Sequence, residues 1–567
     1  MESIEAALST KGFAATRPTC YTDTPSFVGR IKINQWQLEV ELRFLEGKYD
    51  YPEAYLTEWP HDSALHEAFG YRHINDAGKV CYIDGSRTWW DSAKAPELVI
   101  GALVLIEKLL FGNLAGARSD TAIAQDFDGY WRSSQSIYVS DIAHNKTVFH
   151  QVNDEVAHRK WLVPKDKDTW LSIDTEESPN TPWLVTHLKS PPSTLTIKNW
   201  PPTTASEFVF WLDQNDPNYV NQIIFGLRKS IFSKGKEKQG RYGKDIGLAL
   251  TWPEGGEENK LGCGLSLSVP KTAAQAIAEG RLKQAKIVLR KSTEKITRCS
   301  LVRADAHYIQ NRNNPNHNSS LKNKKVVLVG AGTIGGSLAK LLCTHGAGWG
   351  SKGEVHIVDP DTFSVENIGR HLLGAESLGI DKALAVKAIL KTSFPHLNIK
   401  QHTKSITKCW SLITDNSIIV DATGSQTVSI AITDYVSTNN INATLIHSWV
   451  HGHGAATVSL LNDRKNRKGA CFRCLWRIED GTYKPNYELS RDPDKDAPVF
   501  AGCHQSYHPY SSTISTLAAA QSMNLVCDHL NSNAAKTLKF NILNKELCQN
   551  RNDATPEKSA DCPLCNR

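Results

Sequence analysis

The feature that most constrains this chain is a glycine-rich loop between an apolar strand and a helix. Gly330, Gly332 and Gly335 form the pattern GxGxxG directly after the apolar residues 326–329. Glycines at these places let the backbone approach a phosphate at the helix N-terminus, where the helix dipole favours an anion. Asp359 follows 24 residues after Gly335, at the end of a second predicted strand, where a carboxylate can bind ribose hydroxyls. The loop therefore predicts a nucleotide-binding sheet.

Strands and helices alternate regularly after this loop. Further strands are predicted at residues 354–358 and 417–420, and a further helix near residues 382–392. This spacing predicts a parallel, doubly wound, Rossmann-like α/β domain. A polar, turn-forming stretch at residues 311–320 precedes the first strand, so we place this domain at residues 321–567.

Polar and charged side chains downstream of the loop indicate whether the nucleotide is ATP or NAD. Asp361, Asn367, Arg370 and Lys382 follow the second strand, and the third strand ends at Asp421. Nucleotidyl transfer needs cations to neutralise a triphosphate and a carboxylate to hold Mg²⁺, whereas hydride transfer needs neither. The sequence therefore favours ATP with Mg²⁺, and an NAD oxidoreductase is the weaker alternative.

Two CxxC pairs predict a metal site. Cys471 and Cys474 form the first pair, and Cys562 and Cys565 form the second. Two residues between cysteines let both sulfurs face one ion, and four thiolates are a tetrahedral set for Zn²⁺. Because four protein ligands leave no open coordination position, we expect a structural zinc ion rather than a catalytic one.

Residues 330–421, with the motifs V-D-P-D, E-N-I-G-R-H and D-K-A, resemble the adenylation domain of the ThiF/MoeB and ubiquitin-activating family. That family adenylates the C-terminal carboxylate of a protein. The resemblance implies that Asp359 contacts the ribose, that Asn367, Arg370 and Lys382 contact the phosphates, and that Asp421 holds the metal. It also implies a homodimer in which an upstream arginine completes the partner's site, and Arg303 and Arg312 are the candidates. The same family places one CxxC pair after the sheet and the other at the C-terminus.

Cys503 is the first candidate nucleophile. It lies in a polar segment before a predicted helix that starts near residue 513, with His504 and His508 close in sequence. Histidines and a helix N-terminus can lower the pKa of a thiol and so activate it. Residues 499–520 also resemble the family segment where thioester-forming members carry their cysteine.

Cys81 is the second candidate nucleophile. Residues 36–45 alternate apolar and polar side chains as a half-buried strand does, and residues 97–110 have helical spacing, so residues 1–150 read as one α+β domain. From residue 38 the segment resembles a ubiquitin-conjugating domain and ends in H-x-N-x-x-G-x-V-C, with His73, Asn75 and Cys81. In that resemblance Cys81 carries a thioester, and Asn75 donates a hydrogen bond to the oxyanion.

Residues 151–320 carry no recognisable chemistry. Short strand-like runs are separated by Pro- and Gly-rich breaks, and a helical, Ala-rich stretch at 272–289 follows them. We assign this region as a middle α/β linker domain.

Composition limits the partners and the compartment. With 65 Lys and Arg against 59 Asp and Glu, the net charge is only +6, which gives no footprint for direct nucleic-acid binding. The longest apolar run, residues 98–106, is far shorter than the roughly 20 residues that span a bilayer. The N-terminus lacks the pattern of a secretory signal, so we expect no membrane segment and a cytoplasmic protein with reduced cysteines.

A conjugating-like module followed by an activating-like module resembles the fused proteins of bacterial CBASS anti-phage operons. That resemblance implies ATP-dependent activation of the C-terminus of a cGAS/DncV-like nucleotidyltransferase (CD-NTase), a thioester relay from Cys503 to Cys81, and transfer to a target amine. Two alternatives remain open at this point. One is a sulfur-transfer adenylyltransferase of cofactor biosynthesis, and the other is an activating enzyme whose N-terminal module only docks the substrate.

Overall fold

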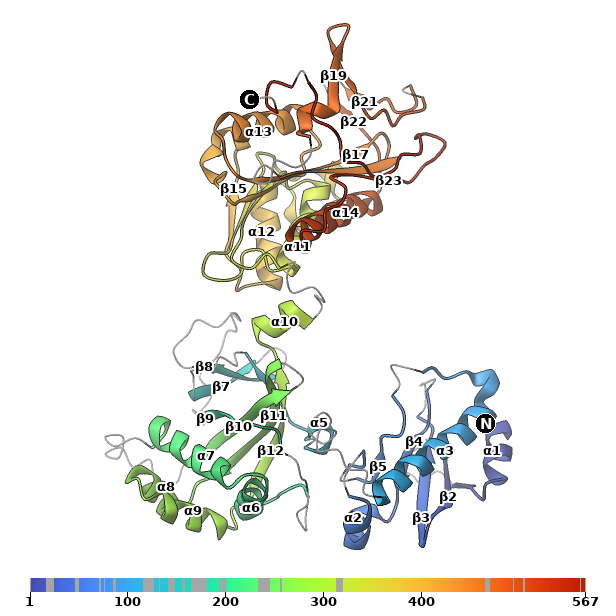
Figure 1. Cartoon of the computed structure of the whole chain (residues 1–567), viewed down its shortest axis with the longest axis vertical. Coiled ribbons are helices and arrows are strands. Elements are labelled where there is room, and N and C mark those ends of the chain that lie inside the picture. Colours follow the sequence, from blue (N-terminus) through green and yellow to red (C-terminus); the bar gives the residue numbers. More distant parts are fainter. Residues whose placement is uncertain are drawn as a thin grey trace. The chain divides into compact units, whose positions relative to one another are not determined.

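A computed structural model gives the fold of the chain (Figure 1). The structure describes residues 2–16, 25–45, 50–70, 73–75, 77–84, 88–115, 127–131, 133–140, 148–154, 159–164, 181–192, 195, 200–232, 245–254, 257–312, 320–463, 470–492, 494–502, 505–560 and 562–565. The chain divides into two compact units. The first comprises Met1–Asp168 and Ile173–Asp305, and the second comprises Thr169–Ser172 and Ala306–Arg567.

The first unit begins with an antiparallel sheet and three helices. The sheet has the order β1-β2-β3-β4-β5, in sequence order throughout. Its strands are β1 (Ala14–Thr16), β2 (Ser26–Ile33), β3 (Trp36–Arg43), β4 (Glu53–Leu56) and β5 (Lys79–Val80). Alternate residues of β3 are buried, as its period-2 pattern predicts. The helices are α1 (Glu2–Ser9), α2 (Ser63–Phe69) and α3 (Ala95–Leu114), and α3 buries Val99, Ile106 and Leu110 in the same core.

A closed barrel forms the rest of the first unit. Its strands follow the order β10-β11-β12-β6-β8-β7-β9, and β9 pairs with β10 to close it. They are β6 (Ser136–Val139), β7 (Val148–Asp154), β8 (Arg159–Pro164), β9 (Pro182–His187), β10 (Asp245–Glu254), β11 (Glu257–Ser268) and β12 (Ile296–Arg303). Because β6 pairs with β8 and β12, the boundary predicted at residue 150 falls inside the barrel.

Helices accompany the barrel strands. They are α5 (Phe127–Tyr130), α6 (Ala205–Asn215), α7 (Pro217–Ser230), α8 (Lys271–Ala278) and α9 (Leu282–Arg290). Asp216 caps α7 by accepting a hydrogen bond from the Asn218 N–H, and Pro217 occupies the first helical position, where its missing N–H costs nothing. The helical stretch predicted at residues 272–289 is two helices rather than one, because the chain turns at Gly280 with a φ of 79°.

The second unit is built on a seven-stranded sheet with the order β15-β14-β13-β16-β17-β18-β23. The first five are parallel to one another, β18 runs antiparallel to β17, and β23 runs antiparallel to β18. The strands are β13 (Lys325–Val329), β14 (Glu354–Val358), β15 (Ile399–His402), β16 (Ile418–Asp421), β17 (Thr444–His451), β18 (Ala456–Asp463) and β23 (Leu538–Ile542). The predicted doubly wound α/β sheet is therefore confirmed.

Helices cover both faces of this sheet (Figure 1). They are α11 (Thr333–Thr344), α12 (Lys382–Ser393), α13 (Gln426–Thr438) and α14 (Ser512–Leu530), with α10 (Ala306–Arg312) before the first strand. Val326 and Leu328 of β13 pack in the core with α11, α12 and α14, whereas Val327 and Val329 pack in the core with α13. A strand with both faces buried is apolar throughout, as residues 326–329 are.

Two hairpins leave the sheet after β18. The first joins β19 (Trp476–Glu479) to β20 (Thr482–Pro485), and the second joins β21 (Val499–Gly502) to β22 (Gln505–Tyr507).

No helix among the described residues is long and apolar enough to cross a membrane.

Candidate functional site: a nucleotide cavity in the second unit

A cavity of about 690 Å³ opens at the carboxyl ends of β13, β14 and β16. The chain turns to β14 on one side of β13 and to β16 on the other, and such a switch point is where parallel α/β sheets bind ligands. Seven of the residues predicted to bind nucleotide line the cavity: Gly330, Gly332, Asp359, Asp361, Asn367, Arg370 and Lys382. Gly335 and Asp421 are not among its lining residues.

The three glycines of the loop have different tasks. Gly330 has a φ of 90°, a conformation that side chains disfavour. A Cβ atom on Gly335 would lie 1.9 Å from the carbonyl oxygen of Gly330, so this glycine allows the loop to pack on its own helix. A Cβ on Gly332 would meet no atom within 4 Å, because Gly332 faces the open cavity at the start of α11. Gly332 is thus the place where a phosphate can approach the helix N-terminus.

Asp359 braces the glycine loop. Its side chain is 5% exposed, Oδ2 accepts a hydrogen bond from the Ala331 N–H at 2.6 Å, and Oδ1 accepts one from the Asp361 N–H at 2.8 Å. Burial raises the pKa of Asp359, and the two N–H groups oppose that rise. The predicted contact with a ribose stays a prediction.

The cavity wall carries two cations. Lys382 Nζ lies 3.1 Å from Asp361 Oδ2, and the Lys382 side chain is 12% exposed against 64% for Asp361. The Arg370 guanidinium donates to the His508 carbonyl at 3.1 Å and lies 4.8 Å above the ring of Tyr510. Arg370 Nε is buried without a hydrogen-bond partner among the described residues. Both cations are therefore held at the cavity wall, where they can meet an anion.

Asn367 is fixed in a short 3₁₀ turn at Val365–Asn367. Its Oδ1 accepts a hydrogen bond from the Ser364 N–H at 3.2 Å, so the carboxamide closes a capping box. Because Oδ1 is used inside the turn, the amide nitrogen of Asn367 is the end of the side chain that can donate to a ligand.

His371 and Tyr510 belong to the site, although the sequence did not single them out. His371 Nε2 donates to the Ala331 carbonyl at 2.7 Å, and Nδ1 accepts from the Leu373 N–H at 3.0 Å. These two bonds fix the tautomer of a ring whose pKa burial lowers. Tyr510 lines the cavity, and its hydroxyl lies 3.1 Å from Thr333 Oγ1 at the start of α11. Only the motif position of His371, directly after Arg370, could have drawn attention to it.

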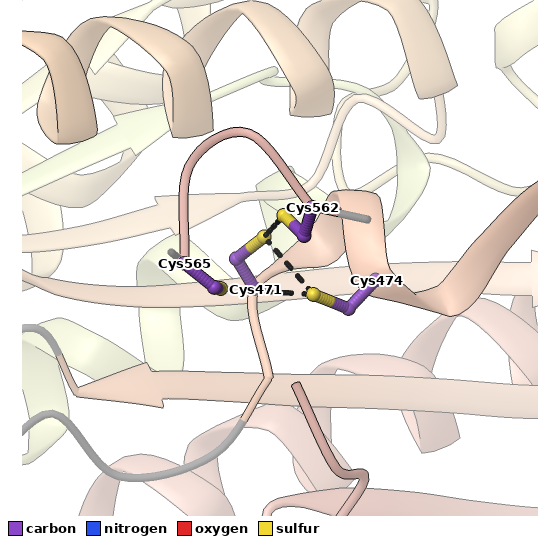
Figure 2. Close-up of side chains that lie close together, drawn as sticks. All are labelled: Cys471, Cys474, Cys562 and Cys565. Carbon is purple, nitrogen blue, oxygen red and sulfur yellow. Dashed lines mark hydrogen bonds between the residues drawn. The ribbon is translucent and has the colours of Figure 1, made fainter. Parts of the chain in front are cut away.

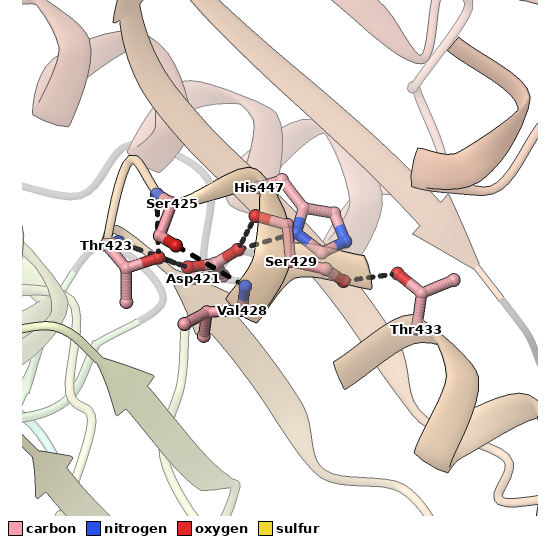
Figure 3. Close-up of polar contacts among 7 residues, drawn as sticks. All are labelled: Asp421, Thr423, Ser425, Val428, Ser429, Thr433 and His447. Carbon is pink, nitrogen blue, oxygen red and sulfur yellow. Dashed lines mark hydrogen bonds and ion pairs between the residues drawn. The ribbon is translucent and has the colours of Figure 1, made fainter. Parts of the chain in front are cut away.

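Asp421 is buried, is not among the residues that line the cavity, and is surrounded by hydrogen-bond donors (Figure 3). Oδ1 accepts hydrogen bonds from the Thr423 N–H at 3.1 Å and hydroxyl at 2.7 Å, and Oδ2 accepts from the Ser429 hydroxyl and from His447 Nδ1, the latter at 2.9 Å. Burial alone would raise the pKa of Asp421, but His447 and the hydroxyls together hold it below its ordinary value.

These bonds bear on the metal role predicted for Asp421, which stays a prediction. A carboxylate has about four lone-pair sites, and four donors occupy them here. The side chain is 3% exposed, so a metal ion could reach it only if one of these donors moved away. Asp421 holds Thr423, whose Oγ1 in turn accepts from the Ser425 N–H at 3.2 Å, and both of these residues line the cavity. The end of a parallel strand marked the right place, but hydrogen bonds to the neighbouring strand and helix fix the carboxylate below the surface.

The four predicted zinc ligands lie together (Figure 2). The sulfur atoms of Cys471, Cys474, Cys562 and Cys565 all lie within 4.8 Å of one another, and three of their separations are 3.6 to 3.7 Å. Four thiolates at about 2.3 Å from one Zn²⁺ would be about 3.8 Å apart in a tetrahedron, so the arrangement suits this ion. The Ser559 N–H donates a hydrogen bond to Cys474 Sγ at 3.4 Å, which would stabilise this sulfur as a thiolate.

The first unit places Cys81 at the end of a hairpin. The Ile74–Val80 bridge closes it, and the Cys81 N–H donates to the His73 carbonyl at 2.7 Å. Asn75 Oδ1 accepts from the Ala77 and Lys79 N–H groups at 3.0 and 2.9 Å, so its amide nitrogen is the end left to donate elsewhere. Cys81 is exposed, unlike Cys263 and Cys299 of the barrel, whose thiols are buried.

The remaining predicted residues are the candidates around Cys503 and the two upstream arginines. Cys503 and His504 lie outside the described residues. His508 is described and lines the cavity. Arg303 pairs with Asp305 at 2.7 Å, whereas Arg312 is exposed with its guanidinium 5.7 Å from the Tyr308 ring.

Comparison with known proteins defines the class of the second unit. Residues 308–564 match the ThiF family, so this part of the chain is a ThiF-type α/β adenylation domain. The chain is also similar to the ATP-dependent ubiquitin transferase-like protein Cap2 of Escherichia coli (strain TW11681), with 26% identity over 91% of this chain and 89% of that protein. The Cap2 of Pseudomonas aeruginosa (strain BWHPSA011 / Pa011) is 24% identical over 87% of this chain and 86% of that protein. The crystal structure of E. coli MccB with MccA-N7isoASN aligns with 44% of this chain and 69% of that chain, at 18% identity and a TM-score of 0.34.

The chain is therefore a Cap2-like enzyme with a ThiF-type adenylation domain.

Proposed function

We propose that this protein adenylates the C-terminal carboxylate of a CD-NTase-like protein, carries the acyl group on cysteines and transfers it to a target amine in anti-phage defence. The cavity of the second unit is the observation that carries this proposal. It joins a glycine loop at a helix N-terminus with two held cations, which is an arrangement suited to a triphosphate.

The first half-reaction needs groups that bind and orient ATP. The carboxylate oxygen of the substrate attacks the α-phosphorus, the bond to the bridging oxygen breaks, and pyrophosphate leaves. Arg370 and Lys382 line the cavity and would stabilise the charge that develops on the phosphates. The amide of Asn367 would donate to a phosphate oxygen, and Asp359, close to the loop, would meet the ribose.

Magnesium would accompany the triphosphate. Mg²⁺ is usually bound by one or two carboxylates together with substrate phosphates and waters. Asp361 is the more exposed of the two carboxylates that line the cavity, so we assign this role to Asp361 in place of Asp421.

The second half-reaction would move the acyl group onto thiols. The thiol of Cys503 would displace AMP from the adenylate, and Cys81 would accept the acyl group by transthiolation. Two observations support this relay. Cys503 lies four residues before Tyr507, which lines the cavity, and Cys81 is exposed beside a turn that orients the amide of Asn75. His73 would hold the cysteine strand through its carbonyl.

The antiparallel sheet with α3 supports a ubiquitin-conjugating-like module over the first part of the chain. Similarity to Cap2 extends over 91% of the chain, far beyond the ThiF-type domain. An N-terminal module that only docks a substrate would not need an exposed cysteine at the end of this hairpin.

Zinc and a second subunit complete the proposal. The four cysteines would hold one Zn²⁺ that ties the chain end to the residues after β18.

In a homodimer an arginine would enter the partner's cavity. Arg312 is exposed, whereas Arg303 is engaged by Asp305, so Arg312 is the better candidate. Sedimentation at micromolar concentration tests the dimer, and a monomer would contradict it.

A non-reducing gel tests the proposal as a whole. The protein is incubated with ATP, Mg²⁺ and a CD-NTase-like protein as the candidate substrate. We expect adducts that DTT removes, together with substrate-dependent exchange of labelled pyrophosphate into ATP. Exchange without any DTT-sensitive adduct would favour a sulfur-transfer adenylyltransferase, and no exchange would contradict adenylation.

A further inference from the structure

A cluster of three histidines and one aspartate lies beside the nucleotide cavity. His451 and His453 are at the tip of the hairpin between β17 and β18, Asp496 precedes β21, and His508 follows β22. Of these four, His508 lines the cavity. The cluster thus reaches the cavity through one imidazole.

The aspartate of this cluster has no hydrogen bond to the described residues. Its side chain is 9% exposed, and both carboxylate oxygens are buried without a partner. His451 Nε2 lies 3.5 Å from Asp496 Oδ2. A Cβ on Gly452 would lie 2.6 Å from Asp496 Oδ1, so the glycine provides the space for this carboxylate. Buried carboxylates without donors are rare and call for an explanation.

His508 presents one nitrogen without a hydrogen bond: Nδ1 is buried and has no hydrogen-bond partner among the described residues. The His453 ring lies 5.5 Å away, and its Nε2 donates to the Ala497 carbonyl at 2.8 Å, which fixes its tautomer. Burial lowers the pKa of His508, the His453 and His451 rings lower it further, and the Asp496 charge opposes them. Together these groups lower the pKa of His508 and so favour its neutral form, which can accept a proton.

The two half-reactions differ in their need for a base. A carboxylate that attacks ATP is already ionised and loses no proton. A thiol that attacks the adenylate must lose one: the C–S bond forms, the acyl C–O bond breaks, AMP leaves with the electron pair, and the S–H proton needs an acceptor. Among the described residues that line the cavity, His508 is the histidine.

We propose that His508 is the general base for thioester formation, with Nε2 accepting the thiol proton and Asp496 positioning the ring through its Nδ1 side. The Asp496 oxygens and His508 Nδ1 make no hydrogen bond to each other here, and catalytic hydrogen bonds often tighten only once substrate is bound. His451 and His453 hold Asp496 and the ring in place. This inference rests on the proposed adenylation and thioester chemistry.

His508→Gln tests the inference because glutamine keeps polarity and similar volume but cannot accept the proton. With a CD-NTase-like protein that the wild-type enzyme charges as substrate, we expect single-turnover thioester formation to fall at least about 100-fold at pH 7. Pyrophosphate exchange should fall no more than about threefold, which is the range we allow for a wall residue that keeps its polarity. His345→Gln, at the end of α11 and outside the cavity lining, is the matched control and should change neither rate.

The pH profile separates a base from a structural residue. In the wild-type protein the thioester rate should fall at low pH as His508 becomes protonated, and this limb should vanish in His508→Gln. Asp496→Asn should move the limb to lower pH, because the carboxylate raises the pKa of His508. The other charged group against this segment, Arg370, contacts the His508 backbone and is unchanged in both variants.

Chemical rescue gives a second measurement. His508→Ala should form thioester slowly, and millimolar imidazole should restore part of the rate. A folded His508→Ala protein that imidazole does not rescue would overturn the inference, as would a His508→Gln protein with wild-type thioester formation. An equal loss of exchange and thioester would make His508 a nucleotide-binding residue instead. Absence of exchange in the wild-type protein would overturn the proposed function itself.

Discussion

His447 Nδ1 lies 2.9 Å from Asp421 Oδ2, and this buried pair connects the cysteine cluster to the nucleotide cavity. The His447 ring packs on Phe472 at 4.8 Å, and Phe472 lies between the zinc-ligand candidates Cys471 and Cys474. On its other side, Asp421 holds Thr423, which lines the cavity. A change at the cysteines can therefore reach the cavity through packed and hydrogen-bonded side chains.

His447→Ala should destabilise the second unit, because it removes one of the four hydrogen-bond donors of the buried Asp421 carboxylate. Leaving a buried charged group without a hydrogen bond costs about 1–3 kcal/mol or more. Urea unfolding measures the loss. His529→Ala is the control: His529 lies 3.7 Å from Asp463 and its side chain is 19% exposed, so we expect a loss of about 1 kcal/mol or less. Equal losses in the two variants would contradict the importance of the buried pair.

The pH dependence of the free energy of unfolding should reveal the protonation of the Asp421 carboxylate. Its pKa lies below the ordinary value in the folded state, so the stability it contributes is complete above an unfolded pKa of about 3.9 and is lost as the pH falls through the lower folded pKa. Asp421→Asn should remove this dependence. The difference in unfolding free energy between wild type and variant should therefore be constant from pH 7 to 5 and shrink below about pH 4. A difference that grows as the pH falls would reverse the sign and contradict the assignment.

Gly332→Ala and Gly335→Ala form a pair that separates binding from packing. Gly332 has a φ of −74° and open space where a Cβ would lie, so alanine should leave the melting temperature unchanged. The same methyl group would stand where a phosphate approaches, and the KM for ATP should rise at least about tenfold. Gly335→Ala places its Cβ against the Gly330 carbonyl and should cost about 1–3 kcal/mol of stability. Calorimetry measures the effect on stability, and pyrophosphate-exchange kinetics measure the effect on KM. An unchanged KM in Gly332→Ala would mean that the phosphate does not bind beside Gly332.

Much of the second unit could be predicted from sequence, because β13, α11, β14, α12 and β16 each have their own local pattern of apolar residues. The barrel could not be predicted in the same way. Its closure depends on β12 pairing in parallel with β6 and on β10 pairing with β9, which are contacts between distant segments. Strand β8 pairs with β6 and β7, but no local signal in its sequence tells which strands it pairs with.

The residues of the candidate site differ in the same way: local sequence predicts some of them, and only the fold reveals the others. Motif spacing predicted Gly332, Arg370 and Lys382 because a phosphate site depends on backbone and charge near one loop. It assigned Asp421 to a metal because the residue ends a strand. It could not foresee that Nδ1 of His447, on the next strand, would donate a hydrogen bond to this carboxylate. Tyr510 comes from a segment far along the chain, which only the folded structure brings to the cavity.

Zinc removal should loosen the end of the chain. Freshly purified protein should contain one Zn²⁺ per chain by elemental analysis. Cys562→Ser should lower the metal content and the melting temperature, since the binding energy of a structural zinc is folding energy. Cys548→Ser, at a buried cysteine outside the cluster, is the control and should keep the zinc. Protein without zinc, purified in the absence of chelators, would contradict the site.

The order of the two cysteines follows from where the adenylate forms. If the acyl group starts in the second unit, Cys503 loads before Cys81, so each substitution stops the relay at a different step. Cys81→Ala should leave a DTT-sensitive substrate adduct on Cys503, and Cys503→Ala should make adenylate but no thioester on either cysteine. Cys263→Ala, at a buried barrel thiol, is the matched control and should keep the full relay. Mass spectrometry of the trapped adducts locates the acyl group. A Cys503→Ala protein that charges Cys81 at the wild-type rate would mean that the adenylate passes its acyl group to Cys81 directly.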